Sequence, residues 1–124
     1  MNTSADQLRI MIDTIPTLAW SCRPDGTTEF LNQRWLDYTG LSREEALEWG
    51  WKVSIHPDDL GKLMDTWLGL HAAGEPGEEE ARLRRADGAY RWFIFRAVPV
   101  RDEKGTVVRW YGTNTAIEDL KRAD

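Results

Sequence analysis

Residues 78–115, EEEARLRRADGAYRWFIFRAVPVRDEKGTVVRWYGTNT, decide the fold class of this chain. From Glu78 onward, apolar and charged side chains alternate, which is the two-residue period of a strand with one buried face. Two polar stretches, ADGA at 86–89 and RDEKG at 101–105, are typical of hairpin turns and divide the segment into three parts. The segment therefore predicts three consecutive antiparallel strands.

Two further strands are expected near the N-terminus. LAWSCRPDG at 18–26 alternates apolar and polar residues and ends in a Pro-Asp-Gly turn, and TTEFLN at 27–32 follows as its partner. Together, these patterns predict an α+β fold in which a five-stranded antiparallel sheet has helices packed on one face.

The stretch between the two strand regions carries signals for these helices. Asn32 is placed to cap a short helix, and Ser42 with Glu45 forms a capping box that begins another. A longer helix is expected from Pro57, which suits a first helical turn. The apolar stripe expected on this helix consists of Leu60, Leu63, Met64, Trp67 and Leu68.

The sequence predicts a helical segment at each end of the chain. Apolar residues at helical spacing predict an amphipathic flanking helix over residues 1–15, and Pro16 ends it. The residues of its apolar face are Leu8, Met11, Ile12 and Ile15. We expect the central domain to span residues 16–117, and residues 118–124 to begin a linker helix that leads to a following domain.

Composition excludes several classes of function. The chain has 124 residues, enough for one domain, and a net charge of −5 with a pI of about 5.1, so a nucleic-acid footprint is not supported. Cys22 is the only cysteine, which excludes an internal disulfide and suits a reducing, cytoplasmic compartment. No run of about 20 apolar residues is present, so no membrane contact is expected from this segment, although a longer parent could be membrane-anchored.

The order of elements and several local motifs resemble a PAS domain with the C-terminal PAC motif of bacterial-type sensor proteins. The matching motifs are WSCRPDGTTEFLN, YTGLSREEAL, IHPDD, DGAYRW and VPVRDEKGTVVRWYGT. The resemblance covers residues 15–118. It implies a cupped sheet that meets the helices around a small cavity, within a sensor histidine kinase, a diguanylate cyclase or a transcription regulator.

The junction between the last strand and the outgoing helix departs from the family pattern. The pattern ends in Asp-Ile-Thr or a near variant, and here the corresponding run is Ala116, Ile117 and Glu118. An Asp at the first position could accept hydrogen bonds from the start of the helix, so its loss is expected to loosen the junction. Thr115 is the nearest alternative cap, and Thr115, Ala116 and Ile117 are the candidate signal-junction residues.

Strand phase predicts which side chains line the cavity. Arg96 would be buried without a partner if Trp92, Ile94 and Val98 faced inward, so Phe93, Phe95 and Ala97 are expected to form the inner set. The candidate ligand-pocket residues are Trp20, Cys22, Met64, Leu68, Phe93, Phe95, Trp110 and Asn114. The resulting pocket is mostly apolar and suits a small apolar or aromatic ligand.

Cofactor chemistry is not expected in this pocket. A flavin photosensor needs a cysteine on the short helix beside the flavin, whereas Cys22 lies on the first strand. Haem needs an axial imidazole, and both His56 and His71 are better explained by roles at the ends of the long helix. Asp58 and Asp59 are interpreted as solvated carboxylates of the first helical turn, and no catalytic or metal-binding residues are assigned.

The leading interpretation is a sensory and dimerisation module of a cytoplasmic signalling protein, most simply a histidine kinase, that relays ligand or partner binding to a C-terminal output domain. Its expected partners are a second copy of the chain and that output domain. The expected interface consists of Leu8, Met11, Ile12, Ile15, Trp92, Ile94 and Val98. One alternative is a module without a ligand that acts purely in protein–protein interaction, and others are part of a cyclic-di-GMP enzyme or of a transcription regulator. A small enzyme is disfavoured because the inward set contains no ionisable pair.

Overall fold

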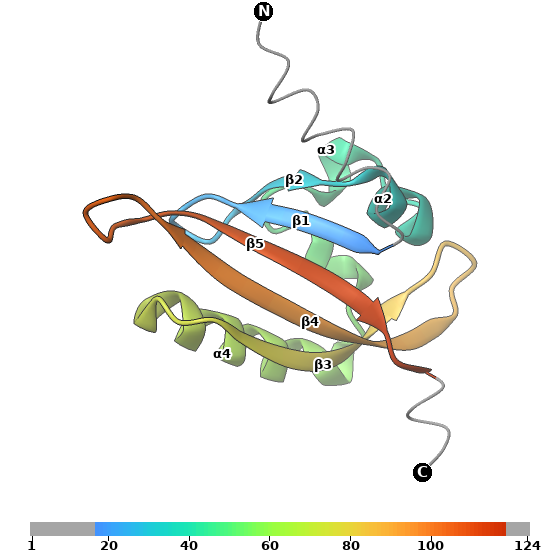
Figure 1. Cartoon of the computed structure of the whole chain (residues 1–124). Helices are drawn as coiled ribbons and strands as arrows, with labels where there is room; N and C mark the ends of the chain where they lie inside the picture. Colours follow the sequence, from blue (N-terminus) through green and yellow to red (C-terminus); the bar gives the residue numbers. More distant parts are fainter. Residues whose placement is uncertain (1–16, 119–124) are drawn as a thin grey trace, which may run out of the picture.

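Five strands form one antiparallel sheet in the order β2-β1-β5-β4-β3 (Figure 1). The structure is a computed structural model that describes residues 17–118. Its strands are β1 (Leu18–Cys22), β2 (Thr28–Leu31), β3 (Gly77–Arg84), β4 (Tyr90–Arg101) and β5 (Val107–Ala116). The first hairpin joins the last three strands because β1 pairs with β5, which places the N-terminal and C-terminal strands side by side in the middle of the sheet.

The helices lie on one face of this sheet, which confirms the predicted α+β architecture (Figure 1). They are α2 (Gln33–Thr39), α3 (Arg43–Ala46), the 3₁₀ helix η1 (Gly50–Ser54) and α4 (Pro57–Ala73). The 3₁₀ helix η1 was not among the predicted elements. The flanking helix expected at 1–15 lies outside the described residues, and with it the proposed interface residues Leu8, Met11, Ile12 and Ile15. Of the linker helix expected at 118–124, only Glu118 is described.

Polar side chains cap the two short helices α2 and α3, and one of them also contacts the sheet. The Asn32 side chain accepts from the backbone N–H of Trp35 and also from that of Ala19, each at 3.1 Å, so one amide caps α2 and ties it to β1. Ser42 and Glu45 form the predicted capping box of α3. These contacts satisfy N–H groups that the first turn of a helix leaves without intrahelical partners.

The long helix α4 is held against the edge strand β3 by an ion pair. The carboxylate of Asp59 accepts from the backbone N–H of Arg82 at 2.8 Å and from two nitrogens of its guanidinium at 2.9 Å. The hydrogen bonds from the Arg82 guanidinium hold the pKa of Asp59 below its usual value. Asp59 is therefore not the solvated carboxylate that the sequence suggested, because its side chain is only 13% exposed, whereas that of Asp58 is 79% exposed.

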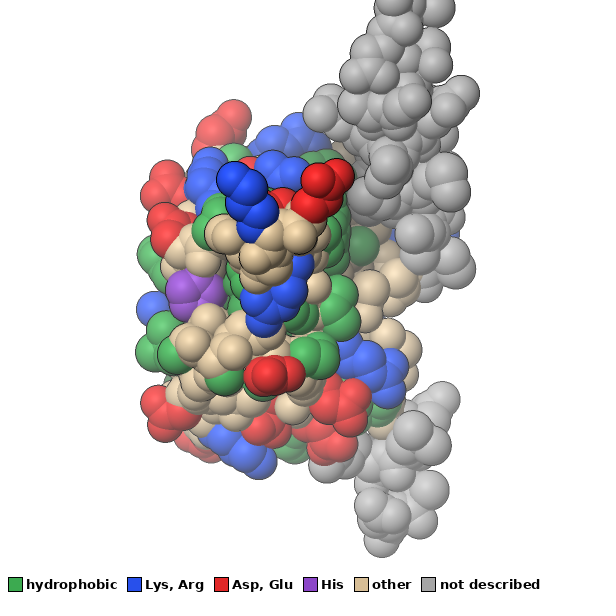
Figure 2. All heavy atoms as spheres, turned by 60° about the vertical axis from the view of Figure 1, so that its left-hand side comes forward, with side chains coloured by type: hydrophobic (Ala, Val, Ile, Leu, Met, Phe, Trp, Pro, Cys, Tyr) green, Lys and Arg blue, Asp and Glu red, His purple; other side chains and the backbone are tan. Residues whose placement is uncertain are grey.

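Charge is mixed on the surface. Figure 2 shows acidic and basic side chains interspersed on one face of the molecule, with no extended basic area in that view. Among residues 17–118, no helix is long and apolar enough to cross a membrane.

Candidate functional site

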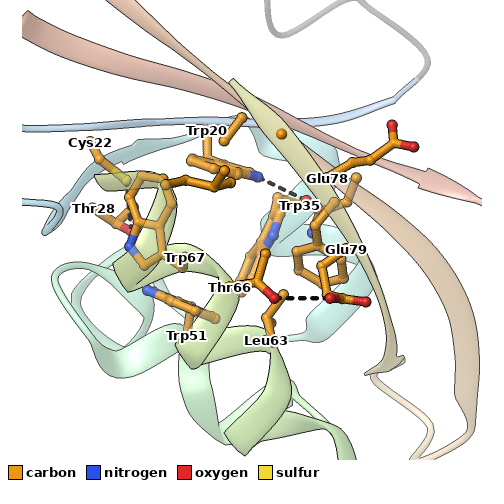
Figure 3. Close-up of a pocket in the computed structure, with 15 residues that line it drawn as sticks. Trp20, Cys22, Thr28, Trp35, Trp51, Leu63, Thr66, Trp67, Glu78 and Glu79 are labelled. Carbon is orange, nitrogen blue, oxygen red and sulfur yellow. Dashed lines mark hydrogen bonds between the residues drawn. The ribbon is translucent and has the colours of Figure 1, made fainter. Parts of the chain in front are cut away.

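A small cavity lies between the inner face of the sheet and the helices (Figure 3). Its volume is about 60 Å³. Four tryptophans from different elements stand around it, which are Trp20, Trp35, Trp51 and Trp67. The other lining residues are Cys22, Thr28, Leu63, Thr66, Leu70, Gly77, Glu78, Glu79, Phe95, Ala97 and Asn114.

On the sheet side of the cavity, Trp20 of β1 and Asn114 of β5 both line it, and Gly112 of β5 lies beneath the Trp20 ring. Trp20 pairs with Gly112 in the strand register, and its indole ring lies directly over that glycine. A Cβ at position 112 would come within 2.0 Å of the ring, so only glycine leaves room for it. In this position, the indole Nε1–H of Trp20 donates to Oδ1 of Asn114 at 2.8 Å (Figure 3).

The opposite wall is one face of α4. Leu63, Thr66, Trp67 and Leu70 follow the helical spacing i, i+3, i+4, i+7, so all four side chains reach the cavity. The ring of Trp67 meets that of Trp20 edge to face, with centroids 6.0 Å apart and an interplanar angle of 83°. This geometry is a favourable arrangement of aromatic quadrupoles and ties α4 to β1.

Few polar atoms face this apolar space. Thr66 Oγ1 donates to Glu79 Oε2 at 2.9 Å (Figure 3). Lys62 Nζ lies 3.4 Å from Oε1 of the same carboxylate. Partial burial alone would raise the pKa of Glu79, but the hydrogen bonds from Thr66, from the Glu80 N–H and from Lys62 together hold it below its usual value. Glu79 therefore carries a negative charge at neutral pH.

Two buried N–H donors on cavity-lining residues have no hydrogen-bond partner among residues 17–118. They are Nε1 of Trp51, on η1, and Nδ2 of Asn114, on β5. Buried polar groups are paired in the great majority of cases, so each of these two donors calls for an acceptor. The Tyr38 hydroxyl and Trp110 Nε1, which do not line the cavity, are also unpaired among residues 17–118.

The Cys22 thiol is part of the cavity wall but is not activated. Burial raises the pKa of Cys22 to about 11, although a contact with Thr28 Oγ1 at 3.6 Å acts in the opposite direction. Because the thiolate is the reactive form, Cys22 behaves as a small buried hydrophobe at neutral pH.

Comparison with known proteins identifies the family. The family model described as "PAS fold" matches residues 28–114. The chain belongs to the PAS family. The cavity between the sheet and the helices is thus the cavity of a PAS domain, a sensory module and not a catalytic one.

Relatives of this PAS domain include much longer proteins. It is 38% identical over 118 residues to the peroxide stress-activated histidine kinase mak1 of Schizosaccharomyces pombe, covering 94% of this chain and 7% of that protein. It is 37% identical over 122 residues to the uncharacterized protein y4lL of Sinorhizobium fredii, covering 98% of this chain and 15% of that protein. The Rhodobacter sphaeroides LOV protein has the same fold, with a TM-score of 0.75 at 13% identity over 94% of this chain and 68% of that one.

The structure brings together half of the eight side chains predicted for the cavity. Trp20, Cys22, Phe95 and Asn114 line it. Three others are packed into the protein beside it and do not line it: Phe93 in the core cluster under α2 and α3, and Trp110 and Met64 in the cluster around Trp67.

The prediction that Leu68 lines the cavity is wrong, because its side chain is 53% exposed. It follows Thr66 by two residues, about 200° around the helix, and so lies on the opposite side of α4 from the cavity. Residue type alone predicted the apolar stripe of α4, so the prediction included Leu68 but neither Leu70 nor Thr66.

The remaining lining residues were not predicted as site residues. Leu63 and Trp67 belong to the predicted apolar stripe of α4, so that signal was available, and Ala97 was placed inward by strand phase. Trp51 lies in η1, for which the sequence carried no recognised signal. Glu79 is charged, and nothing in its sequence context distinguishes it from the neighbouring exposed carboxylates.

Both histidines have the structural positions expected from the sequence. His56 accepts from the backbone N–H of Asp58 at 3.1 Å and caps α4, and His71 in the last turn of α4 contacts the carbonyl oxygen of Pro24. Neither residue lines the cavity, and residues 17–118 hold no group of three or more potential metal ligands.

The end of β5 is attached to β4 by a residue that the sequence reading did not assign. The carboxylate of Glu118 accepts from the backbone N–H of Trp92 at 2.6 Å, and the N–H of Ile117 donates to the Trp92 carbonyl at 2.9 Å. Ala116 and Thr115 continue the strand opposite Phe93 and Ile94. Glu118 thus supplies a side-chain anchor just after the position where the family pattern has Asp.

Proposed function

We propose that this PAS domain binds a small molecule in its cavity and relays occupancy through β5 to an output domain that follows the chain. One observation carries the proposal: Asn114 of β5 lines the cavity, and the same strand ends at Ala116, two residues before the Glu118 anchor. A change in the position of Asn114 is therefore expected to reach Thr115, Ala116 and Ile117, the three junction residues that follow it directly.

The relatives support a histidine kinase as the parent protein. The similarity to mak1 extends over 94% of this chain, and the region that matches is a small part of a histidine kinase. Transmission of a signal to a kinase output, and a cytoplasmic location, are parts of this proposal. A ligand-free module that only binds other proteins is the alternative, and the lined cavity favours the ligand-binding function over it.

The size and the thiol of the cavity argue against a large cofactor. The cavity volume is about 60 Å³, and one water needs about 10–15 Å³ of cavity volume. The cavity therefore has room for about four to six waters, which is close to the space that one aromatic ring fills. A fused three-ring flavin or a haem exceeds this space. Cys22 lies on β1 with a raised pKa, which is the opposite of an activated thiol.

The outer face of the sheet is the proposed contact surface between two copies of the chain. Val98 and Tyr111 are exposed apolar residues there, and a shallow groove runs beside them past Phe30 and Arg96. The proposed interface residues Trp92, Ile94 and Val98 alternate with the inward-facing Phe93 along β4. Val98→Asp is expected to lower the dimer fraction measured by light scattering, whereas an unchanged mass would exclude this face.

The test of the ligand-sensing function is to fill the cavity in the full-length parent. Ala97→Leu places three additional carbons into a lining position that is 6% exposed, and Ala72→Leu makes the same change at an exposed position of α4. We expect Ala97→Leu to change the rate of autophosphorylation and Ala72→Leu to leave it unchanged. If Ala97→Leu folds and leaves the rate as in the unmodified protein, the cavity does not control the output.

A further inference from the structure

We infer that the cavity selects a neutral, ring-sized aromatic molecule that carries a hydrogen-bond acceptor, and that Trp51 Nε1–H and Asn114 Nδ2–H are the donors that recognise it. This inference rests on the proposed ligand-binding function and specifies the chemistry of the ligand. It follows from the two unpaired donors, from the charges near the cavity and from its size.

The Trp20 hydrogen bond determines which end of the Asn114 amide is unpaired. Because Trp20 Nε1 can only donate, the atom of Asn114 that faces it at 2.8 Å must be the oxygen. Rotating the amide by 180° would place two N–H donors against each other. The NH₂ group is therefore left as the free end of a side chain that is 1% exposed and lines the cavity.

Trp51 adds a second donor of the same kind on the helical side. Its Nε1–H is buried without a partner among residues 17–118, and an indole nitrogen cannot accept a hydrogen bond. Both free groups are thus donors, and both are satisfied only by an acceptor. A saturated hydrocarbon would leave them unpaired, which is the costly state for a buried polar group.

Charge excludes an anionic ligand. Among the described residues that line the cavity, none is Lys or Arg, and two are glutamates. The Arg96 guanidinium pairs with Glu78 on the exposed side, and Glu79 remains negative for the reasons given above. Lys62 is already paired with Glu79, so a buried carboxylate or phosphate would meet two glutamates and no unpaired cation among the lining residues.

The apolar wall of the cavity favours an aromatic ligand. Trp20, Trp35, Trp67 and Phe95 present ring faces and edges to a space of about one ring. Toluene, benzonitrile and benzoate are matched probes, because all three carry one benzene ring but differ in having no acceptor, a neutral acceptor and an anionic one.

The test is a titration of this chain, labelled with ¹⁵N, with each probe while the indole and amide side-chain signals are followed by NMR. Trp51→Phe removes one donor and keeps a ring, and Asn114→Asp keeps an oxygen for Trp20 while removing the other donor. The signal that is missing in Trp51→Phe assigns the Trp51 indole. We expect benzonitrile to move the signals of the Trp51 Nε1–H or the Asn114 NH₂ protons downfield. At least one of the two variants should bind benzonitrile about three- to tenfold more weakly than the unmodified chain.

The affinity for toluene is expected to change by less than twofold in the same variants. Benzoate is expected to bind the unmodified chain at least tenfold more weakly than benzonitrile. If toluene and benzonitrile respond equally to both variants and neither N–H signal moves, the assignment of the donors is wrong while ligand binding stands. If Asn114→Asp does not fold, the shifts in the unmodified chain and the Trp51→Phe titration still decide the question. If none of the probes perturbs any signal of a cavity residue, both this inference and binding of ring-sized ligands are overturned.

Discussion

Gly112→Ala is expected to destabilise the domain by displacing one indole ring. The added methyl would lie 2.0, 2.3 and 2.4 Å from Cζ2, Cη2 and Cε2 of Trp20, all far inside van der Waals contact. These atoms belong to a rigid ring held between β5 and Trp67, so the whole side chain must move.

The cost has two parts. Overpacking a filled site costs about 1–3 kcal/mol, and losing the Trp20–Asn114 hydrogen bond with its partners still buried costs about 1–2 kcal/mol more. The free energy of unfolding should therefore fall by about 2–5 kcal/mol, which corresponds to a decrease in Tm of about 8–20 °C for a domain of this size. Denaturant and thermal melts followed by near-ultraviolet circular dichroism measure both quantities.

Gly61→Ala is the matched control, because nothing lies within 4 Å of a Cβ at that position of α4. It should raise stability by about 0.5–1 kcal/mol, as expected for replacing glycine in a helix. In a Trp20→Leu background, the cost of Gly112→Ala should fall to less than half, since the clashing ring is gone. A Gly112→Ala protein within 0.5 kcal/mol of the unmodified one would refute the steric argument.

Three further predictions concern the other contacts. Asp59→Asn should lower the free energy of unfolding by about 1.5–3 kcal/mol at pH 7, and Asp58→Asn by less than 0.5 kcal/mol, in urea melts. Because the pKa of Asp59 is depressed in the folded state, Asp59 stabilises the fold above its unfolded pKa near 4, and this stabilisation is lost as the pH falls. A pH 2–7 series in which the free energy of unfolding of both variants follows that of the unmodified protein would contradict this. Because the pKa of Cys22 is raised to about 11, the free energy of unfolding should fall by up to about 3 kcal/mol as the pH rises from about 9 to 11. Cys22→Ala should not show this decrease, and equal pH profiles of the two proteins would count against a buried thiol. Glu118→Ala should accelerate hydrogen exchange of the Trp92 amide at least fivefold and leave that of Trp20 unchanged, and an unaffected Trp92 would remove Glu118 from the junction.

Local patterns predicted the sheet well because each strand has one buried face. The alternation around Phe93 and Ala97 was resolved by the cost of burying Arg96, and the structure has both residues buried with Arg96 paired to Glu78 at the surface. Capping motifs at Asn32 and Ser42 were equally readable, since the donor and acceptor lie within a few residues of each other.

The cavity was harder to predict because its walls come from segments that are distant in the sequence. The contact of Trp20 with Asn114 spans 94 residues, and that of Thr66 with Glu79 joins a helix to an edge strand. Hydrophobic periodicity could not separate Leu68 from Leu70, since both are apolar and only packing decides which side of α4 is buried. In the same way, only the pairing with Arg82 distinguishes Asp59 from Asp58.

The junction after β5 departs from the family pattern at Ala116. Ala116 replaces the expected Asp, and the resulting expectation was a loosened link between strand and helix. In the structure, the carboxylate of Glu118 is bonded to the backbone of β4. A loosened junction stays a prediction, and Ala116→Asp is expected to raise the Tm because an Asp at this position can cap the predicted linker helix.

Coupling of the cavity to the end of β5 can be measured as hydrogen exchange of the Trp92 and Ile117 amides in this chain, with and without saturating benzonitrile. We expect at least a threefold change in exchange at both amides, together with changes at the cavity. Changes confined to residues that line the cavity, with Trp92 and Ile117 unaffected, would contradict it.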